Sequence, residues 1–358
     1  MRWLLLSAFI LTAVMGASGQ AATGTTQSLP DDPQNLLAAA EPFYDFNAPE
    51  LKPWHLKATY QLYDDNGKPS EQGTYEYWWA SPQVYRSTWT RKGATYSDWH
   101  TADGRHLVLA KAKPLGYFEE GLRSDFVSPL PSLSPFKYET AEPQAKTTYQ
   151  SSVIQAGSLK LPCVAVEDEP SSGPNAKRAI RLPASVSPVF CFDSMLHVLR
   201  VEYSYGVVAT EFDNVVKMQG KFLAREVQVA EGNRSILNAE VDAVDVLSAS
   251  DPALVPDHAS KPLLDPRPGE PIIPAKLMRA EPAIPVRGMR SGQRAEVVLQ
   301  ITVAKNGTVR DLRVVLAPSD EMAEEATRAV SQWRFIPFQQ EGKQVEMRMV
   351  LEEVFHVK

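Results

Sequence analysis

The stretch Ala295–Val309, AEVVLQITVAKNGTV, carries the clearest fold signal of the chain. Its apolar residues recur at every second position: Val297, Leu299, Ile301 and Val303. This period is typical of a strand with one buried face. Asn306-Gly307 follows, and such a pair accepts the positive φ angles of a tight turn. We therefore expect a hairpin in which Thr308–Leu316 returns as the second strand.

The sequence after this hairpin predicts a helix and a closing strand. Pro318-Ser319-Asp320-Glu321 offers a capping hydroxyl and two acids for the positive end of a helix. Apolar residues then fall at helical spacing on one face: Met322, Ala326, Ala329, Val330 and Trp333. Gly342 precedes a final strand expected over Gln344–Val357. Residues 286–358 should therefore form a small unit of order β-β-α-β.

A proline-rich stretch precedes this unit. Residues 251–285 contain nine prolines: Pro252, Pro256, Pro262, Pro266, Pro268, Pro271, Pro274, Pro282 and Pro285. Proline at this density disfavours helices and central strands and favours extended polyproline II. We expect a linker over 251–285. The alternative is a proline-rich crossing that packs against a domain.

Residues 51–250 are predicted to form a large antiparallel β domain. Leu56, Ala58, Tyr60 and Leu62 alternate with polar or half-polar neighbours, and Asp65-Asn66-Gly67 predicts the first hairpin turn. Further strands are expected at Thr74–Trp79, Val84–Thr90, Thr95–Thr101, Thr148–Gln155, Lys160–Val166, Val189–Asp193, Val198–Tyr205, Val207–Lys217, Phe222–Ala230 and Ser235–Val246. Residues 115–127 are more helical. Many short strands at regular spacing predict one curved antiparallel sheet or half-barrel, so the whole chain is an α+β protein of two domains.

The N-terminus predicts export. Arg2 precedes a short apolar run, Trp3–Met15, and small residues around Gly19–Ala21 suit a cleavage site. We expect a signal peptide over 1–21, a mobile lead-in over 22–50 with one helix at Pro33–Ala40, and a location in the periplasm. An uncleaved anchor in the inner membrane is the alternative.

Two cysteines, Cys163 and Cys191, make up the whole cysteine content. In an oxidising compartment an even pair predicts one disulfide. The alternative is a pair of buried thiols. One pair with no nearby histidine is too few ligands for a structural metal site, so we expect no metal and no cofactor. The formal net charge of −6 gives no basis for binding nucleic acid.

No catalytic constellation is visible. The six histidines are His55, His100, His106, His197, His258 and His356. None has the spacing of a metal pair on a helix, and no serine or cysteine stands in a nucleophile elbow. We therefore expect a protein without enzymatic activity. An envelope enzyme would become the better hypothesis if His100 or His106 lay beside a carboxylate in a pocket.

The last 75–90 residues resemble the TonB C-terminal domain family. The likeness includes a proline-rich approach ending in Glu281-Pro282-Ala283-Ile284-Pro285, the turn Asn306-Gly307-Thr308-Val309, and Trp333-Arg334-Phe335-Ile336-Pro337 after an alanine-rich helix. It ends with Gly342-Lys343 and a strand that contains Phe355. The family-motif residues are Gly307, Trp333, Arg334, Phe335 and Pro337. The tyrosine of the family's Pro-x-Tyr-Pro motif is Ile284 here, which puts any contact made by that ring in doubt.

This resemblance implies binding by strand addition. TonB-like domains pair an open edge strand with a short extended segment of an outer-membrane transporter. If this carries over, the edge is the last strand, and we assign partner binding to Val345, Met347, Met349, Leu351 and Val354. The alternative is that this edge is covered within the protein or by a second copy, as a homodimer would allow.

Residues 50–250 bear a weaker resemblance to LolA-like lipoprotein carriers. It rests on the aromatic strands Tyr75–Trp79 and Tyr85–Trp89, on Trp99 and Asp103-Gly104, and on Phe212, Gly220 and Arg225-Glu226-Val227. That family holds an acyl chain against a curved sheet. The tryptophans Trp54, Trp78, Trp79, Trp89 and Trp99 would suit such a lining, or they fill the core beneath the sheet.

The sequence therefore predicts a periplasmic TonB-like protein linked to transport across the outer membrane. Its C-terminal domain would bind a segment of an outer-membrane transporter or another envelope protein. Three alternatives stay open: a membrane-anchored TonB energy transducer, a carrier of an apolar ligand or lipoprotein, and an envelope enzyme.

Overall fold

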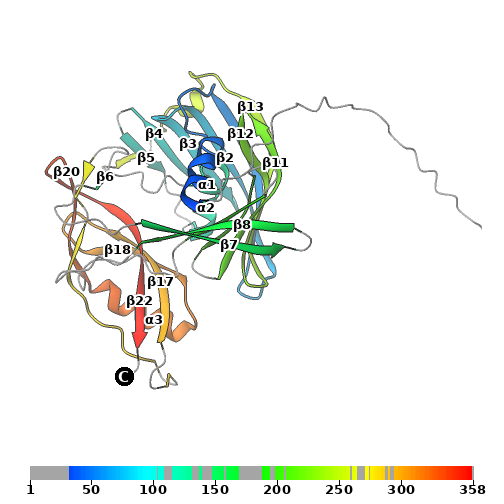
Figure 1. Cartoon of the computed structure of the whole chain (residues 1–358). Coiled ribbons are helices and arrows are strands. Elements are labelled where there is room, and N and C mark those ends of the chain that lie inside the picture. The colour runs from blue at the N-terminus through cyan, green and yellow to red at the C-terminus, as the bar shows by residue number, and fades with distance from the viewer. Residues whose placement is uncertain are drawn as a thin grey trace, which may run out of the picture.

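The structure, a computed structural model, has a large β-sheet domain and a small C-terminal β/α domain (Figure 1). It describes residues 32–102, 104–108, 115–130, 137–138, 147–156, 159–168, 188–193, 198–204, 207–258, 260–263, 271–273, 275–286, 289–290 and 294–356. The predicted signal peptide lies outside these residues. Among the helices within them, none is long and apolar enough to span a bilayer.

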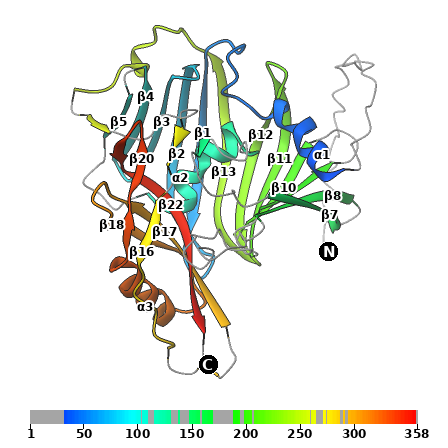
Figure 2. The same ribbon diagram turned by 60° about the vertical axis from the view of Figure 1, so that its left-hand side comes forward.

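One 13-stranded sheet forms the large domain, in the order β14-β5-β4-β3-β2-β1-β13-β12-β11-β10-β9-β8-β7. Its strands are β1 (Trp54–Tyr63), β2 (Pro69–Ser81), β3 (Val84–Arg91), β4 (Ala94–Thr101), β5 (Gly104–Val108), β7 (Thr147–Ala156), β8 (Leu159–Asp168), β9 (Val189–Asp193), β10 (Val198–Ser204), β11 (Val208–Met218), β12 (Lys221–Glu231), β13 (Arg234–Val246) and β14 (Lys261–Leu263). Neighbouring strands pair antiparallel, and the sheet curves strongly (Figure 2). The predicted large antiparallel sheet is therefore confirmed.

Two helices pack on the same face of this sheet (Figure 2). Helix α1 (Pro33–Ala40) begins where Asp32 accepts a hydrogen bond from the Asn35 amide at 2.9 Å. It continues into the short turn η1 (Glu41–Phe43). Helix α2 (Tyr117–Val127) buries Leu122 and Phe126 against the strands. These helices cover the apolar face that the alternating residues of the strands create.

The five tryptophans of strands β1–β4 divide between the two faces of the sheet. Trp54, Trp79 and Trp89 belong to the apolar core. Trp78 and Trp99 lie on the other side, where their rings sandwich the Arg86 guanidinium at 4.7 and 4.6 Å. Because neighbouring strand residues point to opposite faces, these five residues do not form one lining.

Residues 252–254 lie against this second face. The short turn η3 (Pro252–Leu254) places the Ala253 carbonyl where Arg86 Nη1 donates to it at 3.2 Å and Trp99 Nε1 donates at 3.0 Å. The start of the proline-rich stretch is therefore held by side chains of the sheet.

Other parts of 251–285 pair as short strands. β14 adds to β5 at one end of the large sheet, where Pro262 is tolerated because an end strand has only one neighbour. β15 (Pro271–Ile272) runs parallel to β6 (Lys137–Tyr138), and β16 (Lys276–Arg279) pairs with β19 (Arg334–Ile336). The domain and linker boundaries themselves stay a prediction.

The disulfide between Cys163 and Cys191 is formed, with an S–S distance of 2.07 Å. The two residues are directly opposite each other on β8 and β9. They lie in a small apolar cluster with Leu161 and Val201. The prediction of one disulfide is confirmed.

The C-terminal domain has the predicted β-β-α-β frame. β17 (Arg294–Val303) and β18 (Val309–Leu316) form the hairpin, α3 (Asp320–Ser331) follows, and β22 (Met347–His356) returns beside β17. The sheet order is β18-β17-β22. Ser319 caps α3 through a bond from the Met322 amide at 3.3 Å.

The expected single strand over Gln344–Val357 is divided in the structure. β20 (Phe338–Gln340) and β21 (Lys343–Val345) form a hairpin whose turn residues, Glu341 and Gly342, both have positive φ. A two-residue turn of this kind requires positive φ at both positions. Val345 consequently pairs with Phe338, and only from Met347 does the chain pair with β17.

Candidate partner-binding site

Strand β22 is paired along one edge, and in the described part of the chain its other edge is open. It pairs antiparallel with β17 from Met347, opposite Val303, to His356, opposite Arg294. Within the residues that the structure describes, no strand pairs with its other edge. An edge of this kind presents a row of backbone N–H and C=O groups to a further strand.

The side chains of β22 alternate between two environments. Met347, Met349 and Leu351 lie opposite Val303, Ile301 and Leu299, on the face that packs against α3. Leu351 is buried there and the two methionines are half-buried. Val354 is on the opposite face, which also carries Arg348, and is 38% exposed.

The five predicted binding residues therefore do not form one surface. Met347, Met349 and Leu351 share the core face, Val354 is on the outer face, and Val345 belongs to β21. What β22 residues share is the backbone edge, because strand addition uses main-chain groups along the whole strand.

The family-motif residues build the interior of the domain. Trp333, Phe335 and Pro337 are buried, whereas Arg334 is exposed. The Phe335 amide donates to the Gly307 carbonyl at 2.9 Å. A Cβ at Gly307 would lie 1.9 Å from the Phe335 carbonyl oxygen, so this position has no room for a side chain.

The segment before β17 is fastened across α3 and β22. Trp333 Nε1 donates to the Glu281 carbonyl at 2.9 Å, and the Ala283 amide donates to Glu353 Oε1 at 3.0 Å. The Ile284 amide donates to Glu325 Oε1 at 2.7 Å. Burial raises the pKa of Glu353.

Ile284, which replaces the tyrosine of the family motif, is 63% exposed. Its backbone is held by Glu325, but its side chain faces solvent. Sequence reasoning missed Glu325 and Glu353, since a carboxylate that binds a distant backbone amide has no local signature.

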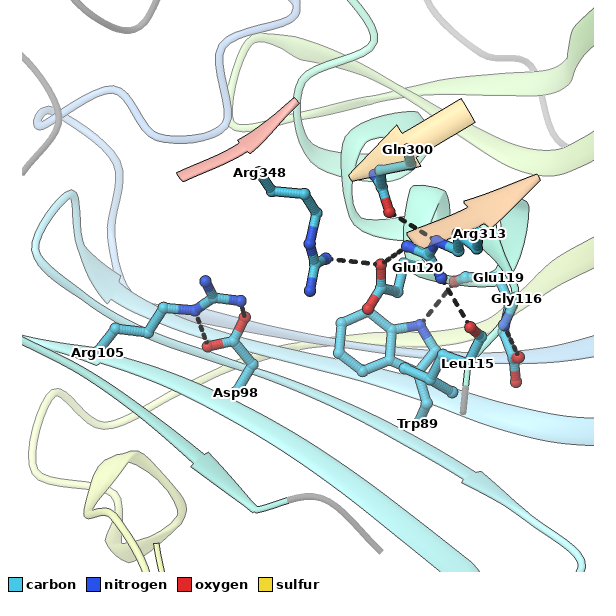
Figure 3. Close-up of polar contacts among 10 residues, drawn as sticks. All are labelled: Trp89, Asp98, Arg105, Leu115, Gly116, Glu119, Glu120, Gln300, Arg313 and Arg348. Carbon is cyan, nitrogen blue, oxygen red and sulfur yellow. Dashed lines mark hydrogen bonds and ion pairs between the residues drawn. The ribbon is translucent and has the colours of Figure 1, made fainter. Parts of the chain in front are cut away.

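The outer face of the C-terminal sheet meets α2 of the large domain (Figure 3). Arg313 on β18 and Arg348 on β22 both bind the Glu120 carboxylate, Arg348 at 2.9 Å. Arg313 also donates to Gln300 Oε1 at 2.6 Å and to the Leu115 carbonyl at 2.8 Å. Sequence reasoning did not find these residues, because 193 positions separate Glu120 from Arg313 along the chain.

A second cluster of polar side chains lies between α2 and strands β3–β5. Arg123 donates to the Tyr85 hydroxyl at 3.2 Å, and the Tyr85 ring stacks on His100. His100 Nε2 is 3.7 Å from Asp98, whose two oxygens are each held by Arg105 at 2.8 Å.

His100 therefore does lie beside a carboxylate. Burial lowers its pKa to about 4, so it is neutral near pH 7. The described residues that act on it are the Tyr85 ring, Asp98, Arg105 and Arg123, and none of them is a serine or cysteine nucleophile. No group of three His, Cys, Asp or Glu side chains in that part of the chain could hold a metal ion.

Two further carboxyl groups face the interior. Asp125 on α2 and Glu202 on β10 are each half-buried. Burial raises the pKa of Glu202 to about 7, and burial together with Glu202 raises the pKa of Asp125. These surroundings favour the neutral form of the acid.

Comparison with known families addresses the C-terminal domain directly. Residues 280–357 match the family model described as Gram-negative bacterial TonB protein C-terminal. The chain carries a TonB C-terminal domain. This TonB domain contains the open edge of β22, the segment 281–285 that is bonded to α3 and β22, and the outer sheet face that contacts α2. The comparison with curated proteins gave no match.

Solved structures resemble the large domain weakly. A LolA superfamily protein from Nitrosomonas europaea is 6% identical, with a TM-score of 0.37, over 62% of this chain and 98% of that one. A domain from Vibrio parahaemolyticus, described as an outer membrane lipoprotein-sorting protein domain, is 10% identical, with a TM-score of 0.35. The match covers 59% of this chain and 91% of that one. A DUF1329 family protein from Desulfovibrio piger is 11% identical, with a TM-score of 0.37, over 63% and 100%.

Proposed function

We propose that this chain is an envelope protein whose TonB domain binds an extended segment of a partner by adding it as a strand to β22. The observation that carries the proposal is the open edge of β22 beside a fully paired β17. The partner class is an outer-membrane transporter or a neighbouring envelope protein, as the family of the domain implies.

The geometry supports this proposal, because β22 is a formed strand whose second edge pairs with no strand of the described chain. The core face of β22 lies in the same apolar cluster as residues of α3, and the outer face is held through Arg348 on Glu120. A strand held on both faces keeps its backbone extended, which lowers the ordering cost of adding a partner strand.

A matched pair of proline variants tests this proposal in the full chain. Successive residues of an edge strand direct their N–H groups alternately to the neighbour and to the open side. Of Met349→Pro and Val350→Pro, one therefore breaks the pairing with β17, and the other removes a donor from the open edge only. Thermal melts identify the second variant, because it keeps most of the stability.

The edge-blocked variant should lose capture of an outer-membrane protein that the wild-type chain pulls from outer-membrane extract. A substitution at an exposed site of the large domain, Val246→Lys, serves as the control and should retain capture. If the folded edge-blocked variant captures the same protein equally well, β22 is not the binding edge.

Export by residues 1–21 completes the proposal. Mass spectrometry of the N-terminus should find a mature chain that starts near residues 20–22. A chain that retains its first residues would instead favour the membrane-anchored transducer.

A further inference from the structure

Two consecutive glutamates on α2 bind opposite domains. Glu119 is buried and turns to the large sheet, where it accepts a hydrogen bond from the Tyr60 hydroxyl at 2.5 Å and forms an ion pair with Arg91, whose Nε is 2.9 Å away. Glu120 is partly exposed and binds Arg313 and Arg348 of the TonB domain. Neighbouring helix residues point about 100° apart, so one turn of α2 connects both sheets.

Helix α2 is anchored in the large domain by buried hydrogen bonds and apolar side chains. The Glu119 carbonyl accepts from Trp89 Nε1 at 2.8 Å, and Glu119 Oε2 accepts from the Gly116 amide at 2.9 Å. Leu122 and Phe126 anchor the same helix in the apolar core. Glu120 is therefore presented from a rigid support.

The attachment of the TonB domain to α2 is shallow and polar. All three strands of its sheet take part: Arg313 from β18, Gln300 from β17, which positions Arg313, and Arg348 from β22 (Figure 3). The Arg313 guanidinium lies 5.7 Å from the centre of the Tyr117 ring. Leu316 of β18 adds an apolar contact with the large core.

Polar, partly exposed contacts of this kind are typical of domains that move relative to each other. Ion pairs between partly exposed groups weaken as salt screens them. The contact between the TonB domain and α2 is polar and partly exposed, and it is made by ion pairs. Arg313 and Arg348 both bind the single carboxylate of Glu120.

We propose that Glu120 is a latch that sets an equilibrium between a seated and a released TonB domain. In the seated form Arg348 fixes β22 to the large domain. In the released form the contacts with α2 are broken, and the chain before β16 still joins the TonB domain to the large domain. The latch does not depend on strand addition; its effect on a partner at β22 rests on the proposed function.

The test compares full-length wild type with Glu120→Gln, which keeps the size of the side chain and removes its charge. Glu346→Gln is the control, because Glu346 pairs with Arg310 at 3.3 Å, an ion pair within the TonB domain. Small-angle scattering reports the radius of gyration, and hydrogen exchange reports protection of residues 115–127.

We expect Glu120→Gln to increase the radius of gyration and to speed exchange in residues 115–127 about two- to fivefold. Wild type should approach the variant when NaCl rises to about 1 M, where the screening length is about 3 Å. Glu346→Gln should match wild type. Arg348→Gln removes one of the two arginines that bind Glu120, so it should change both readouts in the same direction but less, and it should add little effect to Glu120→Gln in the double variant.

Equal radii and equal exchange rates in folded wild type, Glu120→Gln and Arg348→Gln would overturn the latch. The edge-blocked proline variant separates this result from the proposed function. If the edge-blocked variant loses capture but salt does not release the TonB domain, strand addition is supported and the latch is not. If salt releases the domain but the edge-blocked variant still captures the partner, the latch is supported and strand addition is not.

Discussion

Gly307 has both a positive φ angle and no room for a side chain. Its φ is +76°, and a Cβ there would meet the Phe335 carbonyl oxygen at 1.9 Å. Gly342 has a similar φ of +72°, but a Cβ at that residue would have no other atom within 4 Å. The two positions therefore separate the conformational cost of a side chain from its steric cost.

We expect Gly307→Ala to lower the free energy of unfolding of the TonB domain by about 2–4 kcal/mol. Gly342→Ala should cost about 1 kcal/mol, since only the left-handed conformation disfavours it. Hydrogen exchange of the TonB-domain amides at increasing denaturant concentration measures both. Equal losses in the two variants would show that the approach of Phe335 is not the decisive factor.

Glu202 should make stability depend on pH. Burial holds its pKa at about 7, above its ordinary value of 4.5. The folded chain therefore binds a proton that the unfolded chain has lost between these two values, and stability decreases as pH rises from about 4.5 to 7.

Glu202→Gln should reduce this dependence and stabilise the large domain at pH 8 by about 1–2 kcal/mol; the half-buried Asp125 accounts for the rest. Glu211→Gln, on the exposed side of the neighbouring strand β11, is the matched control and should change little. Melting curves at pH 5 and pH 8 decide the matter. A Glu202→Gln profile that keeps the full slope of wild type would exclude Glu202 as its source.

At the scale of elements, the cross-strand disulfide constrains the far end of the large sheet. Cys163 and Cys191 close a loop with a sequence separation of 28. Chain entropy predicts a contribution of about 3–4 kcal/mol for a loop of this length.

The double variant Cys163→Ala/Cys191→Ala should lose about this amount in denaturant unfolding of the large domain, with the TonB domain unchanged. Reduction of the wild type should have the same effect. A double variant as stable as the oxidised wild type would show that the register of β8 and β9 does not need the bond.

Strand and helix positions could be predicted well where a local period decides them. The alternation in β1 and β17 and the helical spacing in α3 each indicate an apolar face that the structure buries. The division of the last strand was missed, because the pairing of Val345 with Phe338 depends on a turn at Glu341-Gly342 rather than on a period.

Within the candidate site, the sequence indicated the edge strand but not its two faces. Val354 and Met349 were grouped together, although the register with β17 puts them on opposite sides. The contact of Glu120 with Arg348 joins residues 228 positions apart, and no local pattern encodes such a pair.

At the scale of the whole molecule, α2 lies between a large sheet and a small one. One side of it closes the apolar core, and the other carries Glu120 toward the TonB domain. The arrangement leaves β22 at the end of its sheet, with its edge open in the described chain. The proposed partner binding and the proposed seating on α2 therefore both involve β22.

Strand addition is tested most directly by residue-resolved hydrogen exchange over Met347–His356 in the full chain, free and bound to the captured envelope protein. We predict that every second amide, those directed to the open edge, becomes slower to exchange on binding, while the amides bonded to β17 change little. Protection that appears elsewhere, with the β22 amides unchanged, would contradict strand addition.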